Sequence, residues 1–182
     1  MWALIKNFCQ RQYYLAYVYG KLRSYAQPLI STEFNIHEIE PNVFIGDFAS
    51  AANDDELKKY GITHIIVAVL GAHPQFPESF VYMTVPLRDV DEEDILQHLP
   101  QTTNFINDAV RSGGKVLVHC VCGVSRSATI VAAWIMMNKE KDEVETEAII
   151  NEMKTKRECI NPILSFRDQL ETFKKNSITR NL

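Results

Sequence analysis

The chain has 182 residues, of which 46% are hydrophobic and 23% are charged, and its formal net charge at pH 7 is −4. This length and composition predict one compact globular domain. The negative charge gives no support to a nucleic-acid binder, because such proteins are usually basic. The four cysteines do not form the pattern of a disulfide framework and fit a reducing compartment better, so we expect an intracellular protein, cytoplasmic or nuclear.

The N-terminal segment, residues 1–30, differs in composition from the rest of the chain. It carries four basic residues, and no acidic residue occurs before Glu33. Apolar and aromatic residues recur mostly at steps of three or four, which predicts a basic amphipathic helix ending before Pro28. Two interpretations stay open. The helix packs on the domain surface, or residues 2–25 contact a membrane surface or target an organelle such as the mitochondrion.

Residues 33–177 alternate between strand-like and helix-like segments and form the second predicted unit. In chain order, we expect a strand at 42–46, a helix at 54–60, strands at 63–69 and 80–87, a helix at 95–109, a strand at 115–119, and helices at 127–138, 143–156 and 162–175. Pro100 is expected to kink or restart its helix. This order predicts a single α/β domain, with a central, mostly parallel, twisted sheet flanked by helices.

The most informative stretch is the loop between strand 115–119 and the apolar helix 127–138. A strand-to-helix loop of this kind is where α/β folds bind ligands. The helix N-terminus offers unpaired N–H groups and a partial positive charge. Small residues let the loop curl until successive N–H groups point inward, and such a nest binds a tetrahedral oxyanion. The loop residues are His119, Cys120, Val121, Cys122, Gly123, Val124 and Ser125.

Two side chains at the ends of this loop carry the expected chemistry. Five residues separate Cys120 from Arg126, so a curled loop brings both to the same anion. Arginine holds two phosphate oxygens in a planar fork. The same surroundings favour the thiolate, so the pKa of Cys120 should fall below the usual value of about 8.5. A thiolate placed there attacks phosphorus and forms a phosphocysteine, which calls for no metal and no cofactor.

The string His119-Cys120-(five residues)-Arg126-Ser127 is similar to the signature of the cysteine-dependent protein tyrosine phosphatase superfamily, and its fuller form resembles the dual-specificity subgroup. Similar segments occur at Asn42-Val-Phe-Ile-Gly46, Gly61-Ile-Thr-His-Ile-Ile66, Val85-Pro-Leu-Arg-Asp89 and Phe166-x-x-Gln169-Leu170. The resemblance covers about residues 35–174. It implies a protein phosphatase that acts on phosphorylated proteins and hydrolyses phosphotyrosine. We expect it to hydrolyse phosphoserine and phosphothreonine as well.

The resemblance also implies roles for other residues. Ser127 matches the hydroxyl that donates a hydrogen bond to the departing thiolate, although a plain helix cap is the alternative. His119 matches the histidine that orients the loop and lowers the pKa of the cysteine. The general acid follows a strand of the Ile-Pro-Leu type in this family, which favours Asp89, with Asp91 as the second choice. The other acidic candidates in this loop are Glu92, Glu93 and Asp94.

Two positions depart from the family pattern. Cys122 stands where a small alanine is usual, and it either fills that space or acts as a resolving thiol for oxidised Cys120, although a disulfide at this spacing would be strained. Ile163 follows Pro162, where the family often has an asparagine that supports the phosphate loop. We therefore expect a slightly less rigid loop.

Three alternatives differ in substrate or class. A lipid, inositol or RNA 5′-phosphatase of the same superfamily would usually carry extra lysine or arginine near the loop, and residues 121–125 are all neutral. The basic N-terminal segment keeps a lipid substrate open. An inactive phosphoprotein-binding module would be expected to lack the cysteine, the arginine or the acid, and all three are present. Low-molecular-weight phosphatases and arsenate reductases carry this loop near the N-terminus, with the acid after it, so the order here excludes them.

Overall fold

The computed structural model describes residues 34–138 and 145–180, the last three by their main chain only. The helix expected in residues 1–30 and the first two residues of the helix expected at 143–156 lie outside these ranges. The described strands are β1 (Ile36–Glu40), β2 (Val43–Gly46), β3 (His64–Val67), β4 (Val81–Thr84) and β5 (Val116–His119). The helices are α2 (Asp54–Tyr60), α3 (Leu99–Arg111), α4 (Arg126–Asn138), α5 (Thr146–Lys156) and α6 (Leu164–Arg180), with short 3-10 turns at Ser50–Ala52 and Leu96–His98.

The strands form one sheet in the order β1-β2-β5-β3-β4. All neighbouring pairs are parallel except β1 with β2, which is antiparallel. The expected mostly parallel sheet is therefore confirmed. Strand β5 lies at its centre and is buried along its whole length. Runs of β-branched residues suit such a position, because they pack well on both faces of a covered sheet.

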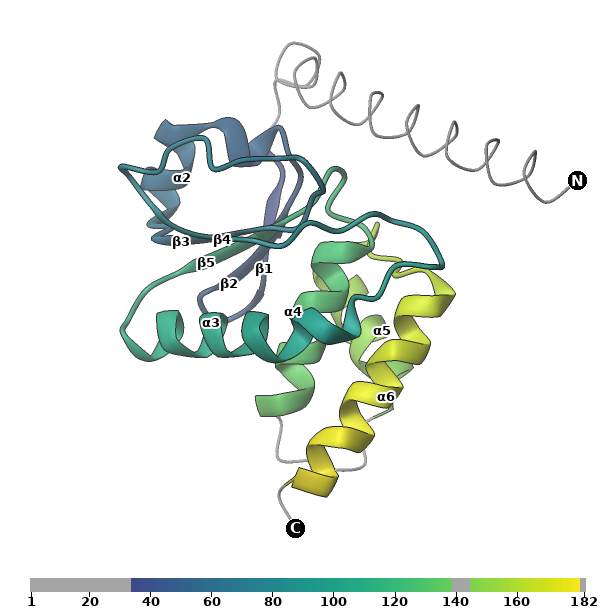
Figure 1. The fold of residues 1–182 in the computed structure, drawn as a ribbon. Helices are drawn as coiled ribbons and strands as arrows, with labels where there is room; N and C mark the ends of the chain where they lie inside the picture. Colours follow the sequence, from purple (N-terminus) through teal and green to yellow (C-terminus); the bar gives the residue numbers. More distant parts are fainter. Residues whose placement is uncertain (1–33, 139–144, 181–182) are drawn as a thin grey trace, which may run out of the picture.

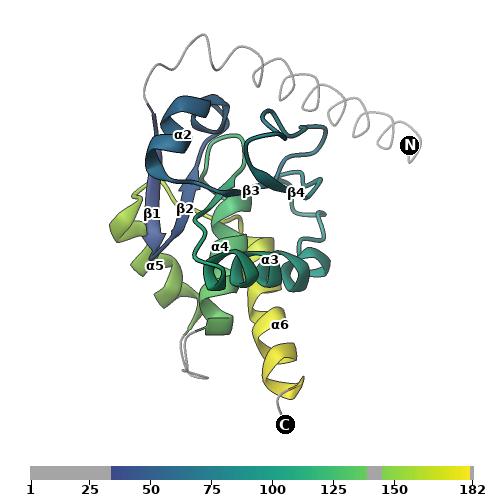
Figure 2. The same ribbon diagram turned by 90° about the vertical axis from the view of Figure 1, so that its left-hand side faces the viewer.

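Helices α3, α4, α5 and α6 cover one face of the sheet and α2 lies on the other, as both views of the ribbon show (Figures 1 and 2). Helix α4 is the centre of the helical layer: it packs on β2 and β5 and also on α3, α5 and α6. All of its residues from Arg126 to Ile135 are buried. This burial explains why the segment is apolar on every side. In the part of the chain that the structure describes, no helix is long and apolar enough to cross a membrane.

Local chemistry explains where several elements begin and end. The Asn53 side chain accepts a hydrogen bond from the N–H of Glu56 at the start of α2, and Gly61 ends that helix with a φ of 75°. Pro100 lies in the first turn of α3, so the helix restarts there after the 3-10 turn Leu96–His98. Proline is tolerated at this place because the N–H it lacks has no partner within the helix.

Candidate active site

The loop from Cys120 to Ser125 joins the central strand β5 to the central helix α4. Donors outside the loop hold several of its carbonyl groups. They include Phe48 N–H to Val121 O at 3.1 Å, Asn161 N–H to Val124 O at 2.8 Å, and the Thr129 hydroxyl to Ser125 O at 2.9 Å. Because the two groups of a peptide unit point in opposite directions, carbonyls fixed outside leave N–H groups to point inside. The loop therefore forms the nest that its sequence predicts.

Gly123 is required by the shape of this loop. Its φ is +67°, a conformation that other residues rarely adopt. A Cβ atom at Gly123 would also lie 2.5 Å from the Gly46 carbonyl oxygen and 2.8 Å from Nη2 of Arg157. Its N–H donates to Cys120 Sγ at 3.2 Å. Glycine thus allows the close approach that brings a main-chain donor to the sulfur.

Cys120 lies at the floor of the loop, with 1% of its surface exposed. Burial alone would raise the pKa of its thiol. The Arg126 guanidinium, the Ser127 hydroxyl and the N–H groups of Ser127 and Val124 favour the thiolate more strongly, so the pKa of Cys120 falls below its usual range. The Ser127 hydroxyl donates to Sγ at 3.4 Å. The site therefore stabilises a negatively charged sulfur inside the protein.

Arg126 lies beside the loop, and its side chain makes hydrogen bonds to main-chain oxygens. Its Nη1 donates to the main-chain oxygens of Ala68 and Leu87 at 3.4 and 3.3 Å, and the residue is 8% exposed. Its Nε is buried, and no group among the described residues accepts a hydrogen bond from it. A buried donor without a partner costs roughly 1–3 kcal/mol. The oxygen of a bound phosphate would remove that cost.

The acidic loop between β4 and α3 brings one carboxylate to the site. Asp89 Oδ2 lies 3.7 Å from Arg126 Nε, with the Asp89 side chain 34% exposed. Glu93 instead pairs with Arg88, and Asp91 is exposed to solvent. Of the five acidic candidates, the structure thus places Asp89 beside the predicted phosphate clamp.

His119 ends β5 and immediately precedes Cys120 in the chain. It is 3% exposed, and its Nδ1 lies 3.2 Å from the Cys120 carbonyl oxygen. Burial lowers the pKa of His119 to about 4. The imidazole is therefore neutral at pH 7 and orients the start of the loop without adding a charge. The resemblance had suggested that this histidine lowers the pKa of the cysteine, and a neutral ring would not do so by charge.

Two positions that the sequence left open have clear surroundings. The Cys122 side chain is exposed, whereas Cys120 is buried, and no disulfide joins the two. Ile163 occupies the place of the family asparagine, yet its main-chain N–H donates to the Ser125 hydroxyl at 3.3 Å. The loop thus keeps a contact from this segment that does not depend on the side chain.

The residue that the sequence analysis missed is Arg157. It is buried beneath the loop and donates to main-chain oxygens of Gly123 and Cys122. In the sequence it is one of several basic residues at the end of a charged segment. Only its partners distinguish it, and they lie 34 and 35 positions away.

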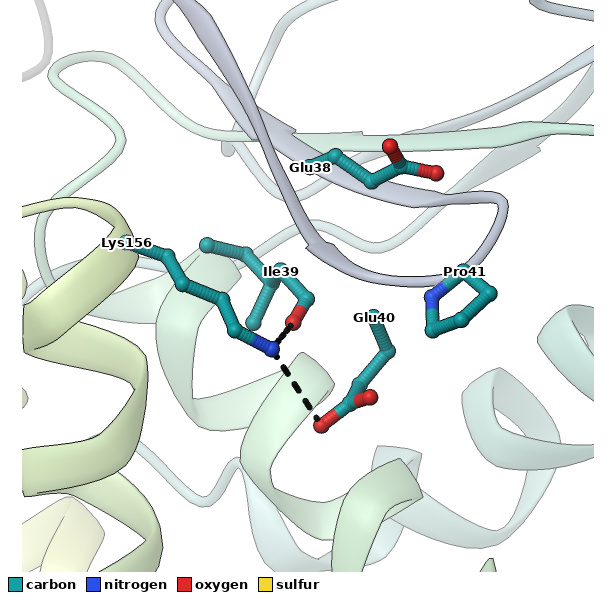
Figure 3. A pocket seen from close by; sticks show the side chains of 5 residues that line it. All are labelled: Glu38, Ile39, Glu40, Pro41 and Lys156. Carbon is teal, nitrogen blue, oxygen red and sulfur yellow. Dashed lines mark hydrogen bonds and ion pairs between the residues drawn. The ribbon is translucent and has the colours of Figure 1, made fainter.

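A pocket of about 370 Å³ lies at the opposite end of the sheet, around the turn between β1 and β2 (Figure 3). Its lining residues are Glu38, Ile39, Glu40, Pro41 and Lys156. Lys156 Nζ donates to the main-chain oxygen of Ile39 and lies 3.7 Å from Glu40 Oε1. None of these five residues is a cysteine, serine or threonine, so the phosphate loop remains the candidate active site.

The fold and the site together define a class of protein. The site lies at the end of a parallel strand and the start of a helix. It holds a buried thiolate, main-chain amides, and an arginine whose Nε N–H has no hydrogen-bond acceptor in the described part of the chain. Such a site suits nucleophilic phosphoryl transfer to sulfur. This class is the cysteine-based phosphatases.

Comparisons with known proteins agree with this class. The family model described as "Dual specificity phosphatase, catalytic domain" matches residues 43–176. The chain is 33% identical over 159 residues to dual specificity protein phosphatase 1B of Arabidopsis thaliana, covering 87% of this chain and 93% of that protein. It is 32% identical over 143 residues to human dual specificity protein phosphatase 22, covering 79% and 76% of the two chains.

Solved structures give the same answer. A mouse putative dual specificity phosphatase, complexed with zinc tungstate, superimposes with a TM-score of 0.74 at 28% identity, covering 83% of this chain and 93% of that one. The human tyrosine phosphatase-like serine/threonine/tyrosine-interacting protein gives 0.73 at 33% identity, covering 80% and 99%. The chain belongs to the dual specificity phosphatase family of the protein tyrosine phosphatase superfamily.

Membership of this family also indicates the activity. The chain is a cysteine-based, metal-independent protein phosphatase of the dual-specificity type. The comparisons do not favour the lipid-phosphatase or inactive-binder alternatives.

Proposed function

We propose that Cys120, Arg126, Asp89 and Ser127 perform this hydrolysis, each in a separate role. The observation that carries the proposal is the buried Nε of Arg126, which has no hydrogen-bond acceptor among the described residues and lies beside a stabilised thiolate. Such a donor fits an oxygen of the transferring phosphoryl group, whose charge it stabilises in the transition state. The nest of N–H groups binds the remaining oxygens.

In the first step, the Cys120 thiolate attacks phosphorus and an S–P bond forms. The P–O ester bond breaks, and its electron pair goes to the oxygen of the leaving side chain. Asp89, in its protonated form, gives its proton to that oxygen, so the alcohol or phenol departs neutral. The position of Asp89 beside Arg126 supports this role, since both must reach the same substrate.

In the second step, water attacks the phosphocysteine. The Asp89 carboxylate takes a proton from the water, an O–P bond forms and the S–P bond breaks. The electron pair returns to sulfur, where the Ser127 hydroxyl, 3.4 Å away, stabilises the departing thiolate. Inorganic phosphate leaves, and Asp89 is protonated again for the next cycle.

The substrate that fits this site best is a singly phosphorylated protein side chain. Residues 121–125 are neutral, so the loop offers no extra cation to a second phosphate. Next to the loop, Leu164 is exposed at the start of α6 and follows Ile163, whose N–H contacts Ser125. An apolar rim of this kind favours the hydrophobic stem and neighbours of a phosphorylated residue.

A substrate panel tests the proposal. Wild type should hydrolyse phosphotyrosine and phosphothreonine peptides in the presence of EDTA, whereas Cys120→Ser should be inactive and still retain a phosphopeptide. A phosphoinositide should be hydrolysed much more slowly. Faster phosphoinositide than peptide hydrolysis would overturn the substrate assignment. Activity that survives Cys120→Ser would overturn the mechanism.

A further inference from the structure

Arg157 is a buried cation that connects the phosphate loop to the beginning of the sheet. It follows α5 and is 2% exposed. On one side, its Nε donates to Gly123 O at 3.0 Å and its Nη2 to Cys122 O at 3.2 Å. On the other side, its Nη1 lies 2.7 Å from Asn35 Oδ1 and 2.8 Å from His37 Nδ1.

This burial is unusual because no carboxylate within the described residues lies at ion-pair distance from Arg157. A buried charge is costly unless it is paired and hydrogen-bonded. Here only neutral acceptors among the described residues bind the guanidinium. Two of these acceptors are main-chain oxygens of consecutive loop residues, Cys122 and Gly123. A planar fork reaches both oxygens at once, which a lysine ammonium would not do.

The geometry of the peptide unit links these contacts to the nucleophile. In a trans peptide, the carbonyl of one residue and the N–H of the next point in opposite directions. Fixing the Cys122 carbonyl toward Arg157 turns the Gly123 N–H the other way, where it donates to Cys120 Sγ at 3.2 Å. Fixing the Gly123 carbonyl likewise turns the Val124 N–H toward the sulfur, whose pKa it lowers.

We propose that Arg157 is a positioning residue, which acts on catalysis by setting the direction of the two main-chain amides that hold the Cys120 thiolate and then the phosphate. It supports the loop from the side opposite to the substrate. The inference rests on the proposed role of Cys120 as the nucleophile.

The test compares Arg157→Lys, which keeps the charge and loses the fork, with Arg167→Lys. Arg167 is a matched control because it also makes several hydrogen bonds, to Pro162, Asn161 and Glu147, without touching residues 119–127. The readouts are the ionisation of Cys120, followed by ultraviolet absorbance and by alkylation rate against pH, and the pH profile of kcat/KM. Thermal unfolding of each variant reports on stability.

We expect Arg157→Lys to raise the pKa of Cys120, to move the acid limb of kcat/KM to higher pH and to lower kcat about 10- to 100-fold. Arg167→Lys should leave the thiol titration at its wild-type position, even where it lowers the melting temperature. A folded Arg157→Lys protein with the wild-type thiol titration and kcat would overturn the inference.

A second variant covers the case in which Arg157→Lys does not fold. Asn35→Ala keeps Arg157 and removes its 2.7 Å side-chain anchor, so it should shift the thiol titration in the same direction by a smaller amount. An unchanged titration curve in this variant would count against the proposal. The wild-type protein separates the proposed role of Cys120 from that of Arg157. A Cys120 thiol that is protonated at pH 7 would reject the proposed chemistry itself. A thiolate whose titration changes in neither variant would reject only the role of Arg157.

Discussion

At the scale of single residues, the proposed catalysis depends on the ionisation of the Cys120 thiol. Burial opposes this ionisation, whereas the Arg126 charge and several hydrogen bonds favour it. Burial of Cys120 works against the thiolate, and Arg126, Ser127 and the loop amides outweigh it. Each of these donors contributes only a modest free energy, since a hydrogen bond to a charged group contributes roughly 1.5–3 kcal/mol. The thiolate therefore needs several of them at once, and the loss of one should be measurable.

Replacing the phosphate clamp tests its geometry rather than its charge. Arg126→Lys keeps a positive charge and loses the planar fork with its two carbonyl contacts. We expect kcat/KM for an aryl phosphate to fall about 10²–10³-fold, because a point charge does not hold two phosphate oxygens in the transition state. A rate within threefold of wild type would show that charge alone is sufficient.

The choice between Asp89 and Asp91 can be decided with paired variants. Asp89→Asn should lower kcat about 10²–10⁴-fold on phosphothreonine, whose alkoxide leaving group needs a proton, and by less on a nitrophenyl phosphate. Asp91→Asn is the matched control and should leave both rates nearly unchanged. The reverse pattern would move the general acid to Asp91.

Single residues also show how far the sequence alone reaches into the site. Five residues separate Cys120 from Arg126 on one loop, so their meeting follows from local chain geometry. Asp89 needed the family pattern, because five acidic residues occur nearby and charge does not distinguish them. Arg157 was missed because its acceptors in the loop are main-chain oxygens, which every residue possesses and no sequence pattern marks.

At the scale of elements, the loop that carries Asp89 is held in place by helix α6. The Gln169 side chain accepts a hydrogen bond from the Leu96 N–H and donates to Glu93 O, each at 2.9 Å. The amide thus fastens the acidic loop shortly before α3 begins. A general acid must lie within hydrogen-bond distance of the leaving oxygen. We therefore expect the Gln169 contact, which holds the loop, to help keep Asp89 in position.

Removing this contact should affect the chemical step more than binding. Gln169→Ala should lower kcat about 10-fold on phosphothreonine with little change in KM, because a displaced acid protonates the leaving group less often. Thr172→Ala, an exposed position on the same helix, is the control and should behave as wild type. A change in KM alone would show that Gln169 serves substrate binding.

The elements also show why some parts of a fold are easier to predict than others. Helix α2 matches its expected bounds, because Asn53 and Gly61 are strong start and stop signals. Strand β1 was missed, since His37, Glu38 and Glu40 interrupt its apolar pattern, which is typical of an edge strand that avoids further pairing. Expected strand 80–87 shortened to β4, because Pro86 does not donate to a sheet ladder.

At the scale of the whole molecule, pH should control stability through the histidines that are neutral in the fold. The pKa of His119 is about 4 in the folded protein and near 6.5 when unfolded, and those of His37 and His64 are also lowered, with burial the largest cause in each case. A lowered pKa means that protonation favours the unfolded state. This stabilisation is therefore complete above pH 6.5 and is lost as the pH falls toward 4.

We expect His119 alone to account for about 3 kcal/mol of that loss in the free energy of unfolding. Urea unfolding measured at intervals between pH 7 and pH 4 would show it. His119→Gln should flatten the curve, because a glutamine side chain does not take up a proton in this range. A wild-type curve that is already flat would contradict the buried neutral state.

The position of the catalytic loop between β5 and α4 has a consequence for how this enzyme loses activity. Both flanking elements belong to the most deeply enclosed part of the molecule, so the loop has no independent way to open. The loop should therefore lose its shape only when the entire chain unfolds cooperatively. Loss of activity on heating and thermal unfolding should therefore occur at the same temperature, with no intermediate that is folded but inactive.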